Sequence, residues 1–153
     1  MINVRLARRN EVTDLQKLNN EVFIDNTIYD DDLDPNWAMS NKGFTYFTSL
    51  LNDPQSLCLI VEDGEKKIGY LAAGPKEIDY RLGKYAEVQN MGVIPEYRSH
   101  GIGKQLLCRC FDWARNQGFS KVFVCSYAKN KRAIEFYRSS GFEEIDISLE
   151  KDL

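Results

Sequence analysis

A glycine loop, Arg98-Ser99-His100-Gly101-Ile102-Gly103, joins a predicted strand to a predicted helix in this sequence. Glycines allow successive backbone N–H groups to point into one concavity, because no Cβ atom stands in the way. The N-terminus of the following helix carries a partial positive charge, and Arg98 and Lys104 add full charges at the rim. The loop therefore predicts a site for a phosphate-bearing anion.

Three known kinds of glycine loop can be compared with this one. A P-loop needs G-x-x-x-x-G-K-[ST], but its first glycine would fall on Arg98 and its last residue on Gln105. A dinucleotide loop needs G-x-G-x-x-G, and Leu106 stands at its third glycine. The form Arg-x-x-Gly-x-Gly, found in the pyrophosphate loops of acyl-CoA-binding proteins, fits in full. A plain strand-to-helix turn remains the alternative for the loop taken alone.

The segments on either side of the loop follow strand and helix patterns. Apolar residues recur at every second position in the predicted strands and at three- and four-residue steps in the predicted helices. Gly92, inside the strand before the loop, predicts a β-bulge or a close backbone approach. The expected elements are, in chain order, strand 3–8, helices 10–23 and 41–52, strands 56–62, 67–73 and 86–94, helix 101–117, strand 121–126, helix 130–140 and strand 143–150. This order predicts an α/β sandwich, one mixed sheet with helices on both faces.

Length and composition restrict the class of protein. A chain of 153 residues corresponds to one domain, and 43% hydrophobic with 28% charged residues excludes disorder, collagen and coiled coil as descriptions of the whole chain. No run of about 18 uncharged apolar residues is present, so we expect no membrane span. The first ten residues lack the apolar core of a secretory signal, so we expect a cytoplasmic protein.

Charge and cysteine usage point to an anionic ligand and away from metal chemistry. Nine basic residues lie between Arg98 and Arg138, opposed only by Asp112 and Glu135. Such a segment suggests an anionic ligand, although a solvated surface explains it as well, and it carries no aromatic motif for stacking on nucleic acid. The four cysteines form no C-x-x-C motif and are expected to be small buried or half-buried apolar residues. Since His100 is the only histidine, no cysteine has an evident base.

Two separated motifs resemble the signature of the GCN5-related N-acetyltransferase (GNAT) superfamily. The first runs from Asn90 through the glycine loop to Leu107, and the second, N-x-x-A-x-x-F-Y-x-x-x-G-F, covers Asn130–Phe142. The only departure in the loop is Ser99, where many members have glycine. The resemblance implies a single α/β domain over residues 1–153. Its sheet would be mixed and mostly antiparallel, with helices on both faces and strands that splay apart at the cofactor site.

The resemblance also implies which residues bind the cosubstrate acetyl-CoA. Met91 and Val93 occupy strand positions whose backbone groups face the pantetheine arm, and an N–H near Met91 is a candidate oxyanion donor. Asn130 matches an asparagine that contacts pantetheine, and it also suits a helix N-cap. The implied cofactor-binding set is Met91, Gly92, Val93, Arg98, Ser99, His100, Gly101, Ile102, Gly103, Lys104 and Asn130. No metal is expected.

Two catalytic residues are implied, and each has a purely structural alternative. Tyr137 matches the tyrosine that protonates the leaving thiolate, and a phenol suits that task because it is neutral at pH 7 yet can donate a proton. Glu87 lies where the histone-acetyltransferase branch of the family has its general base. Tyr137 could instead be a core tyrosine, and Glu87 a polar residue on the solvent side of its strand. His100 is not expected to be catalytic, since it belongs to the loop.

The acceptor is the least determined partner. Residues 25–34 hold five aspartates and no basic residue, and the aromatic residues that follow are Trp37, Phe44, Tyr46 and Phe47. Acids and aromatic rings suit a cationic or amine-bearing acceptor, although a solvated loop over core aromatics explains them equally well. Cys125 and Tyr127 stand where the ribosomal-protein N-terminal acetyltransferase branch has glutamate and arginine, which disfavours an N-terminal peptide as acceptor.

The sequence thus favours an acetyl-CoA-dependent N-acetyltransferase. It would move the acetyl group directly to a primary amine, most simply on a small molecule. The alternatives are a protein or peptide amine as acceptor, and a non-catalytic acyl-CoA-binding regulatory domain. Neither nucleic acid nor a membrane is expected as a partner, and a homodimer is left open.

Overall fold

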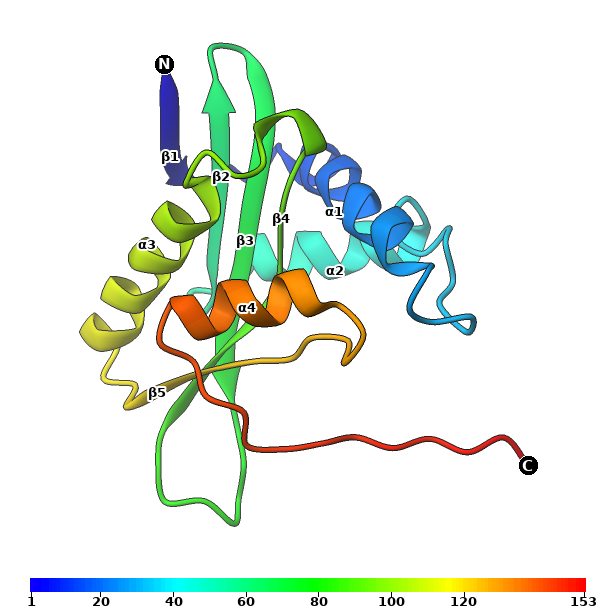
Figure 1. The fold of residues 1–153 in the computed structure, drawn as a ribbon. Coiled ribbons are helices and arrows are strands. Elements are labelled where there is room, and N and C mark those ends of the chain that lie inside the picture. Colours follow the sequence, from blue (N-terminus) through cyan, green and yellow to red (C-terminus); the bar gives the residue numbers. More distant parts are fainter.

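The computed structural model describes all residues, 1–153, and Figure 1 shows one layer of strands with helices packed around it. The strands are β1 (Ile2–Leu6), β2 (Leu57–Asp63), β3 (Lys66–Lys76), β4 (Tyr85–Val93) and β5 (Lys121–Val124). The helices are α1 (Val12–Asn26), α2 (Asn41–Asn52), α3 (Ile102–Asn116) and α4 (Lys131–Ser139), and the short 3-10 helix η1 (Pro95–Tyr97) precedes the glycine loop. None of these helices combines the length and the apolar character that crossing a membrane would need.

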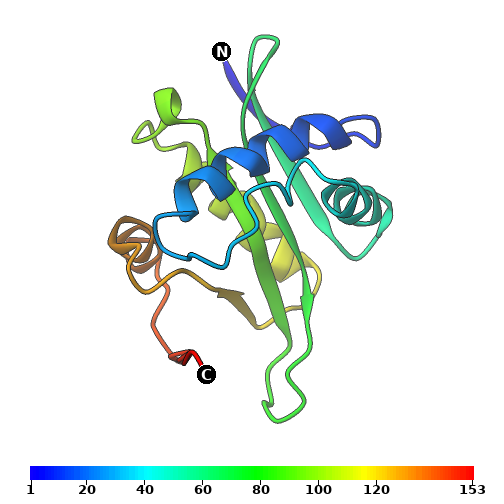
Figure 2. The same cartoon turned by 90° about the vertical axis from the view of Figure 1, so that its right-hand side faces the viewer.

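The strands form a single sheet in the order β1-β2-β3-β4-β5. Neighbours from β1 to β4 are antiparallel, whereas β4 and β5 run parallel. Helices α1 and α2 lie on one face of this sheet, and α3 and α4 lie on the other (Figure 2). The predicted α/β fold, with a mixed and mostly antiparallel sheet between helices, is confirmed.

Each face of the sheet has its own apolar core. The core beneath α3 joins apolar residues of β2, β3 and β4 to Ile102, Leu106 and Leu107, and Tyr137 of α4 packs at its edge. The core beneath α1 and α2 joins β2 and β3 to side chains that include Leu15 and Phe47. Because successive strand residues point to opposite faces, the two cores use alternate positions of each strand.

Residues that mark the ends of helices predicted most element boundaries to within a few residues. Ser40 and Asn130 cap α2 and α4 with their side chains, and Gly118 has a φ of +78° where α3 ends. These residues hold the terminal backbone groups that a helix cannot satisfy itself, so they fix its ends. The helix expected over residues 10–23 begins two residues later, at Val12, and the residue at its N-cap position is Glu11.

The expected final strand over residues 143–150 is wrong. This segment has no regular secondary structure and forms no backbone hydrogen bond to the sheet. Ile145, Ile147 and Leu149 do alternate as in a strand, but alternation predicts only which side chains share a face. A strand also needs a neighbouring edge within hydrogen-bonding distance, and the segment runs away from the body of the molecule (Figure 1).

The predicted bulge lies three residues earlier than expected. Ala72 pairs with Asn90 and Ala73 with Val88, so the extra residue of β4 is Gln89 rather than Gly92. Gly92 instead allows a close approach, since a Cβ atom there would lie 2.5 Å from Cγ2 of Val22 in α1.

Candidate active site

The glycine loop presents a row of free backbone donors. Ser99 and Gly101 have φ values of +65° and +78°, in the left-handed region, and Gly101 is the N-cap of α3. The first helical bond runs from the N–H of Gln105 to the carbonyl of Gly101, and the six N–H groups from Ser99 to Lys104 have no partner in the chain. A Cβ atom on Gly101 would meet nothing within 4 Å, so the space in front of these donors is open. Six free donors at a helix N-terminus suit an anion.

β4 and β5 separate from each other near this loop. Their pairing covers only Tyr85–Val88 of β4 and Lys121–Val124 of β5, and β4 continues alone to Val93. The N–H of Ile94 donates to the carbonyl of Ile68 in β3. Because N–H groups alternate between the two sides of a strand, those of Met91 and Val93 point away from β3 and into the gap left by β5. The predicted splay of the strands is therefore present.

The bulge at Gln89 decides which side chains lie on each face of β4. Met91 and Val93 pack against the core beneath α3, whereas Asn90 pairs with Ala72, which belongs to the core beneath α1 and α2. Glu87 pairs with Gly74, two residues beyond Ala72, and so shares the α1 and α2 face. Glu87 and the side chains of Met91 and Val93 thus lie on opposite faces of the sheet.

Tyr137 lies on α4, on the α3 side of the sheet. Its ring packs against Phe136 and Phe142, with ring centroids 5.4 and 5.6 Å away. Burial raises the pKa of the Tyr137 hydroxyl to about 12, and no hydrogen bond to another residue contributes to that shift. A hydroxyl in this environment keeps its proton at neutral pH and has capacity to donate it.

Glu87 has a charged neighbour that its flanking residues do not reveal. Nζ of Lys76, in β3, lies 3.3 Å from a carboxylate oxygen of Glu87. The same ammonium lies 4.5 Å from the centre of the Phe123 ring. Glu87 is half-buried, so the expectation of a merely solvent-facing residue is too simple: its carboxylate belongs to a cluster that spans β3, β4 and β5.

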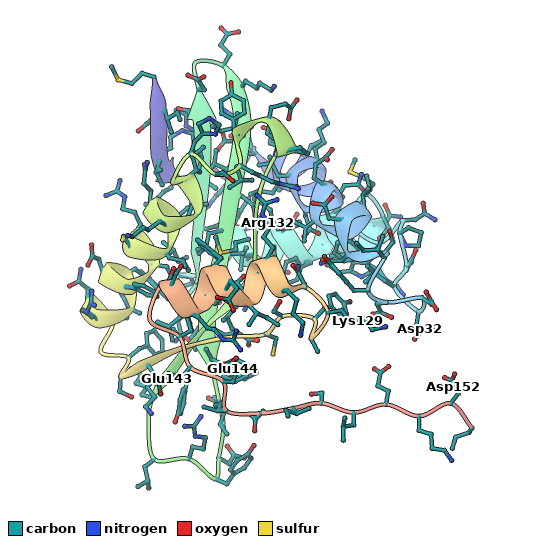
Figure 3. The ribbon with its side chains drawn as sticks, viewed as in Figure 1. Asp32, Lys129, Arg132, Glu143, Glu144 and Asp152 are labelled. Carbon is teal, nitrogen blue, oxygen red and sulfur yellow. The ribbon has the colours of Figure 1, made fainter.

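Arg98 is tied into the fold more firmly than the motif suggests. Its Nε donates to the carbonyl of Val93, and its guanidinium pairs with Asp25 at the end of α1. Part of the charge of the Arg98 guanidinium is therefore already neutralised. The backbone carbonyl oxygen of Arg98 lies 2.7 Å from Nδ1 of His100. Arg132 of α4, labelled in Figure 3, approaches the loop with a nitrogen 3.4 Å from Oγ of Ser99. This arginine supplies positive charge that the motif did not predict.

Asn130 and Gly103 help to position α4 beside the loop. Oδ1 of Asn130 accepts a hydrogen bond from the N–H of Ala133, which confirms the expected N-cap. That bond leaves the amide Nδ2 group of Asn130 without a hydrogen bond to the chain. A Cβ atom on Gly103 would lie 3.0 Å from the Phe136 ring, so a larger residue there would require this ring to shift.

On the opposite face, aromatic and polar side chains form a wall beside the gap. Phe23 stacks on Trp37, and Trp37 meets Tyr46 edge-on, with ring centroids 5.5 and 5.6 Å apart. The hydroxyl of Tyr46 donates to Oε1 of Gln89 and accepts from Nδ2 of Asn90, at 2.6 and 3.0 Å. Burial is the main cause that raises the pKa of Tyr46 to about 12. Gln89 and Asn90 were not among the expected site residues, since their shared partner Tyr46 lies 43 and 44 residues away in the chain.

The acidic segment closes one end of this wall. The hydroxyl of Tyr127, which follows β5, donates to Asp30 at 2.8 Å, and the rings of Tyr29 and Tyr127 stack at 6.0 Å. Asp32 points outward from the same loop (Figure 3). The segment between α1 and α2 therefore reaches across to the chain that leaves β5, and its remaining acids are exposed.

Two of the four cysteines are buried, as the sequence predicts, and the other two are exposed. Cys58 and Cys110 are buried, and burial raises the pKa of both thiols to about 12, which leaves them poor nucleophiles. Cys108 of α3 and Cys125, which directly follows β5, are however exposed. The structure has no group of three or more His, Cys, Asp or Glu side chains that could hold a metal ion.

Comparison with known proteins identifies the family. The model of the acetyltransferase (GNAT) family matches residues 15–142, so the chain belongs to that family. An uncharacterized N-acetyltransferase of Methanocaldococcus jannaschii is 30% identical over 103 residues, which cover 67% of this chain and 46% of that protein. Human N-acetyltransferase 8 is 29% identical over 96 residues, 63% of this chain and 42% of that protein. The chain thus spans less than half the length of these relatives.

Solved structures show the same fold at low sequence identity. A variant of the BH1408 protein of Bacillus halodurans has a TM-score of 0.87 with 18% identity, covering 99% of both chains. An aminoglycoside N-acetyltransferase in complex with CoA has a TM-score of 0.77 with 16% identity, covering all of this chain and 95% of the other.

Proposed function

We propose that this chain is an acetyl-CoA-dependent N-acetyltransferase that moves an acetyl group directly to a primary amine of a small molecule. The observation that carries the proposal is the row of six unpartnered N–H groups from Ser99 to Lys104, next to the gap where β4 leaves β5. An unpaired backbone donor is costly unless water or a ligand satisfies it, so a continuous row of them favours a ligand with many acceptor oxygens.

The residues present fit CoA. The six donors and the N-terminus of α3 would hold its pyrophosphate, with Lys104 and Arg132 nearby as cations. The free N–H groups of Met91 and Val93, together with Nδ2 of Asn130, would bind the amide groups of the pantetheine arm. When bound, acetyl-CoA supplies the activated acetyl thioester. The gap between β4 and β5 would then bring that end of the molecule toward Tyr137.

The proposed acid and the proposed base lie on opposite faces of the sheet. Tyr137 holds a proton on the α3 face, where it can be donated to a departing thiolate. Glu87 lies on the α1 and α2 face, where its carboxylate can accept a proton from the incoming ammonium, directly or through water. The N–H of Met91 points into the gap between them and can stabilise negative charge on a carbonyl oxygen.

The acceptor site belongs on the α1 and α2 face. Its aromatic wall and the exposed aspartates of residues 31–34 suit an amine that carries positive charge. Two proteins of the same fold are aminoglycoside N-acetyltransferases, which act on amine-bearing small molecules. We therefore infer a small cationic amine as acceptor, and no role for nucleic acid or a membrane.

The loop assignment can be tested with two matched glycine variants. Gly101 and Gly118 both have a φ of +78° and open space around the missing Cβ atom, at opposite ends of α3. Alanine at either position is strained by about 1–2 kcal/mol, so both variants should lose similar stability. We expect Gly101→Ala to weaken CoA binding in calorimetry by about tenfold or more, and Gly118→Ala to bind as the original chain does.

Activity is tested by the release of free thiol from acetyl-CoA in the presence of a panel of small amines. Amine-dependent release by the original chain supports an enzyme. Tight CoA binding without release for any small amine or peptide would leave a non-catalytic acyl-CoA-binding domain. Equal CoA affinity of both glycine variants would show that the loop does not bind the pyrophosphate.

A further inference from the structure

Arg98, the first residue of the glycine loop, directs its side-chain donors away from the loop. Its Nε donates to the carbonyl of Val93, the last residue of β4, at 2.8 Å. Its Nη2 lies 2.5 Å from a carboxylate oxygen of Asp25 in the last turn of α1. The Arg98 side chain is only 24% exposed. Two of the three guanidinium nitrogens are thus already bonded, and Arg98 links the end of β4 to the end of α1.

Asp30 anchors the acidic segment, residues 25–34, at a second point. One carboxylate oxygen of Asp30 accepts a hydrogen bond from the hydroxyl of Tyr127 at 2.8 Å, and the other accepts from the N–H of Asp32 at 3.0 Å. Burial and the hydrogen bond to Asp30 raise the pKa of the Tyr127 hydroxyl to about 12, so this group keeps its proton at neutral pH. The ring of Tyr29 stacks on Tyr127 and adds to the contact.

The two anchors lie on opposite sides of the gap between β4 and β5. Arg98 follows the end of β4, whereas Tyr127 follows the end of β5. Figure 2 shows the chain after α1 close to the chain that links β5 to α4, on the face of the sheet that α1 and α2 cover. A segment held at both points crosses the gap, and it does so on the face where we place the acceptor.

Side chains, and not backbone hydrogen bonds, place the acidic segment over the gap. Every backbone hydrogen bond of residues 27–34 joins positions three or four apart along the chain. Such bonds set the local shape of the segment but not its position relative to the sheet. Of its five aspartates, two form the anchors and the other three, Asp31, Asp32 and Asp34, are exposed. Arg98 and Tyr127 therefore help to decide where these three free acids lie.

We infer that Arg98 is a positioning residue for the acceptor and does not bind the pyrophosphate. Together with Tyr127 it holds the acidic segment across the gap, so that the exposed aspartates lie where a cationic amine enters. Lys104 and Arg132 are then the cations that meet the phosphates. This inference rests on the proposed function, because it assigns a task on the acceptor side of the same site.

The test compares Asp25→Asn, which releases Arg98 without changing the loop, with Arg98→Gln. Both variants should raise KM for the acceptor amine by about twofold to fivefold, the effect of one ion pair at the surface, and leave kcat and the CoA dissociation constant unchanged. The double variant should have the acceptor KM of either single variant, because both changes break the same link. Steady-state kinetics and calorimetry with CoA measure these values.

The alternative, in which Arg98 binds the pyrophosphate, predicts a different pattern. Arg98→Gln would then weaken CoA binding by about tenfold, the effect of a lost charged hydrogen bond. Asp25→Asn would tighten CoA binding, because it frees the charge of Arg98 for the phosphates. Either change in CoA affinity, or an unchanged acceptor KM in both variants, would overturn the inference.

Asp112→Asn and Arg115→Gln are matched controls. These residues form an exposed ion pair of 3.1 Å on α3, and its loss should change neither the acceptor KM nor the CoA affinity. Hydrogen exchange adds a readout that needs no turnover: the amides of residues 27–34 should exchange faster in Asp25→Asn and Tyr127→Phe, and at the original rate in the controls.

Failure of the proposed function would look different. The original chain would then release no thiol from acetyl-CoA with any amine. The CoA affinities and the exchange rates would still decide whether Arg98 anchors the acidic segment.

Discussion

A single hydroxyl in apolar surroundings carries the proposed acid step. Burial raises the pKa of Tyr137 to about 12, so the hydroxyl keeps its proton at all pH values below about 11. We expect Tyr137→Phe to lower kcat by about 10²–10⁴-fold with little change in KM for acetyl-CoA, because the lost interaction forms mainly in the transition state. Steady-state kinetics against acetyl-CoA measure both values.

Tyr97→Phe is the control for this change. The hydroxyl of Tyr97 donates to Asp63 at the far end of β2, so its removal should leave kcat unchanged. A Tyr137→Phe variant with the original kcat would leave Tyr137 with a packing role only.

Glu87 is tested by a change that keeps its shape. Glu87→Gln removes the proton-accepting charge but leaves a side chain of the same size near Lys76. If Glu87 is the base, turnover near neutral pH should fall by about 10²-fold or more, while CoA affinity stays the same because the loop is untouched. Glu65→Gln, in the exposed turn after β2, should change neither. An unchanged pH–rate profile would move the base role to a water molecule or to an aspartate of residues 25–34.

Helix α4 offers a way to separate a structural role from a binding role in one residue. Asn130→Ser keeps an oxygen that can accept the N–H of Ala133 but removes the Nδ2 group. We expect this variant to retain the original melting temperature and to raise KM for acetyl-CoA by about fivefold, the effect of one lost hydrogen bond. Asn130→Ala should show the same raised KM as Asn130→Ser and should also lose about 1 kcal/mol of stability. If KM rises only in Asn130→Ala, Asn130 acts through the cap alone.

At the level of elements, the sequence was most informative where the signal is local. Gly101, Gly118 and Asn130 define the ends of α3 and the start of α4 through their own backbone or side-chain geometry, so their roles could be predicted from neighbouring residues. The fold class followed from the order of such elements. The loop followed from six consecutive residues.

Pairings between distant strands could not be predicted in this way. The bulge at Gln89 depends on how β3 lies against β4, and Lys76 meets Glu87 because of the same register. Likewise, the alternation of residues 143–150 gives the face of each side chain but not the presence of a neighbouring edge. The position of Glu87 relative to Met91 therefore became clear only from the structure.

For the whole molecule, an ion cluster that joins three strands controls stability in acid. Arg5 of β1 donates to both Glu11 and Glu62, and Lys67 of β3 pairs with Glu62. The hydrogen bond from Arg5 is the main cause that lowers the pKa of both carboxyls from 4.5 to about 2. Since the folded state holds these protons less tightly than the unfolded chain, the stabilisation is complete above pH 4.5 and is lost as the pH falls toward 2.

Glu11→Gln should therefore be less stable than the original chain by about 1.5–3 kcal/mol at pH 7. The difference should shrink as the pH is lowered from 4.5 to 2, because the original chain then loses the same charge. Thermal unfolding at a series of pH values measures it. A difference in melting temperature that stays constant over this range would mean that the cluster does not act through ionisation.

The extra residue in β4 must stay outside the ladder for the two halves of the site to keep their faces. Deleting Gln89 would remove one exposed side chain, but it would also restore an unbroken alternation along the strand. Val88 and Asn90 would become neighbours, and because they already face opposite sides of the sheet, Glu87 and the pair Met91 and Val93 would keep their faces. Taking Gln89 into a regular ladder without any deletion would do the opposite: Glu87 would then share a face with Met91 and Val93, and half of the site would move to the other side of the sheet.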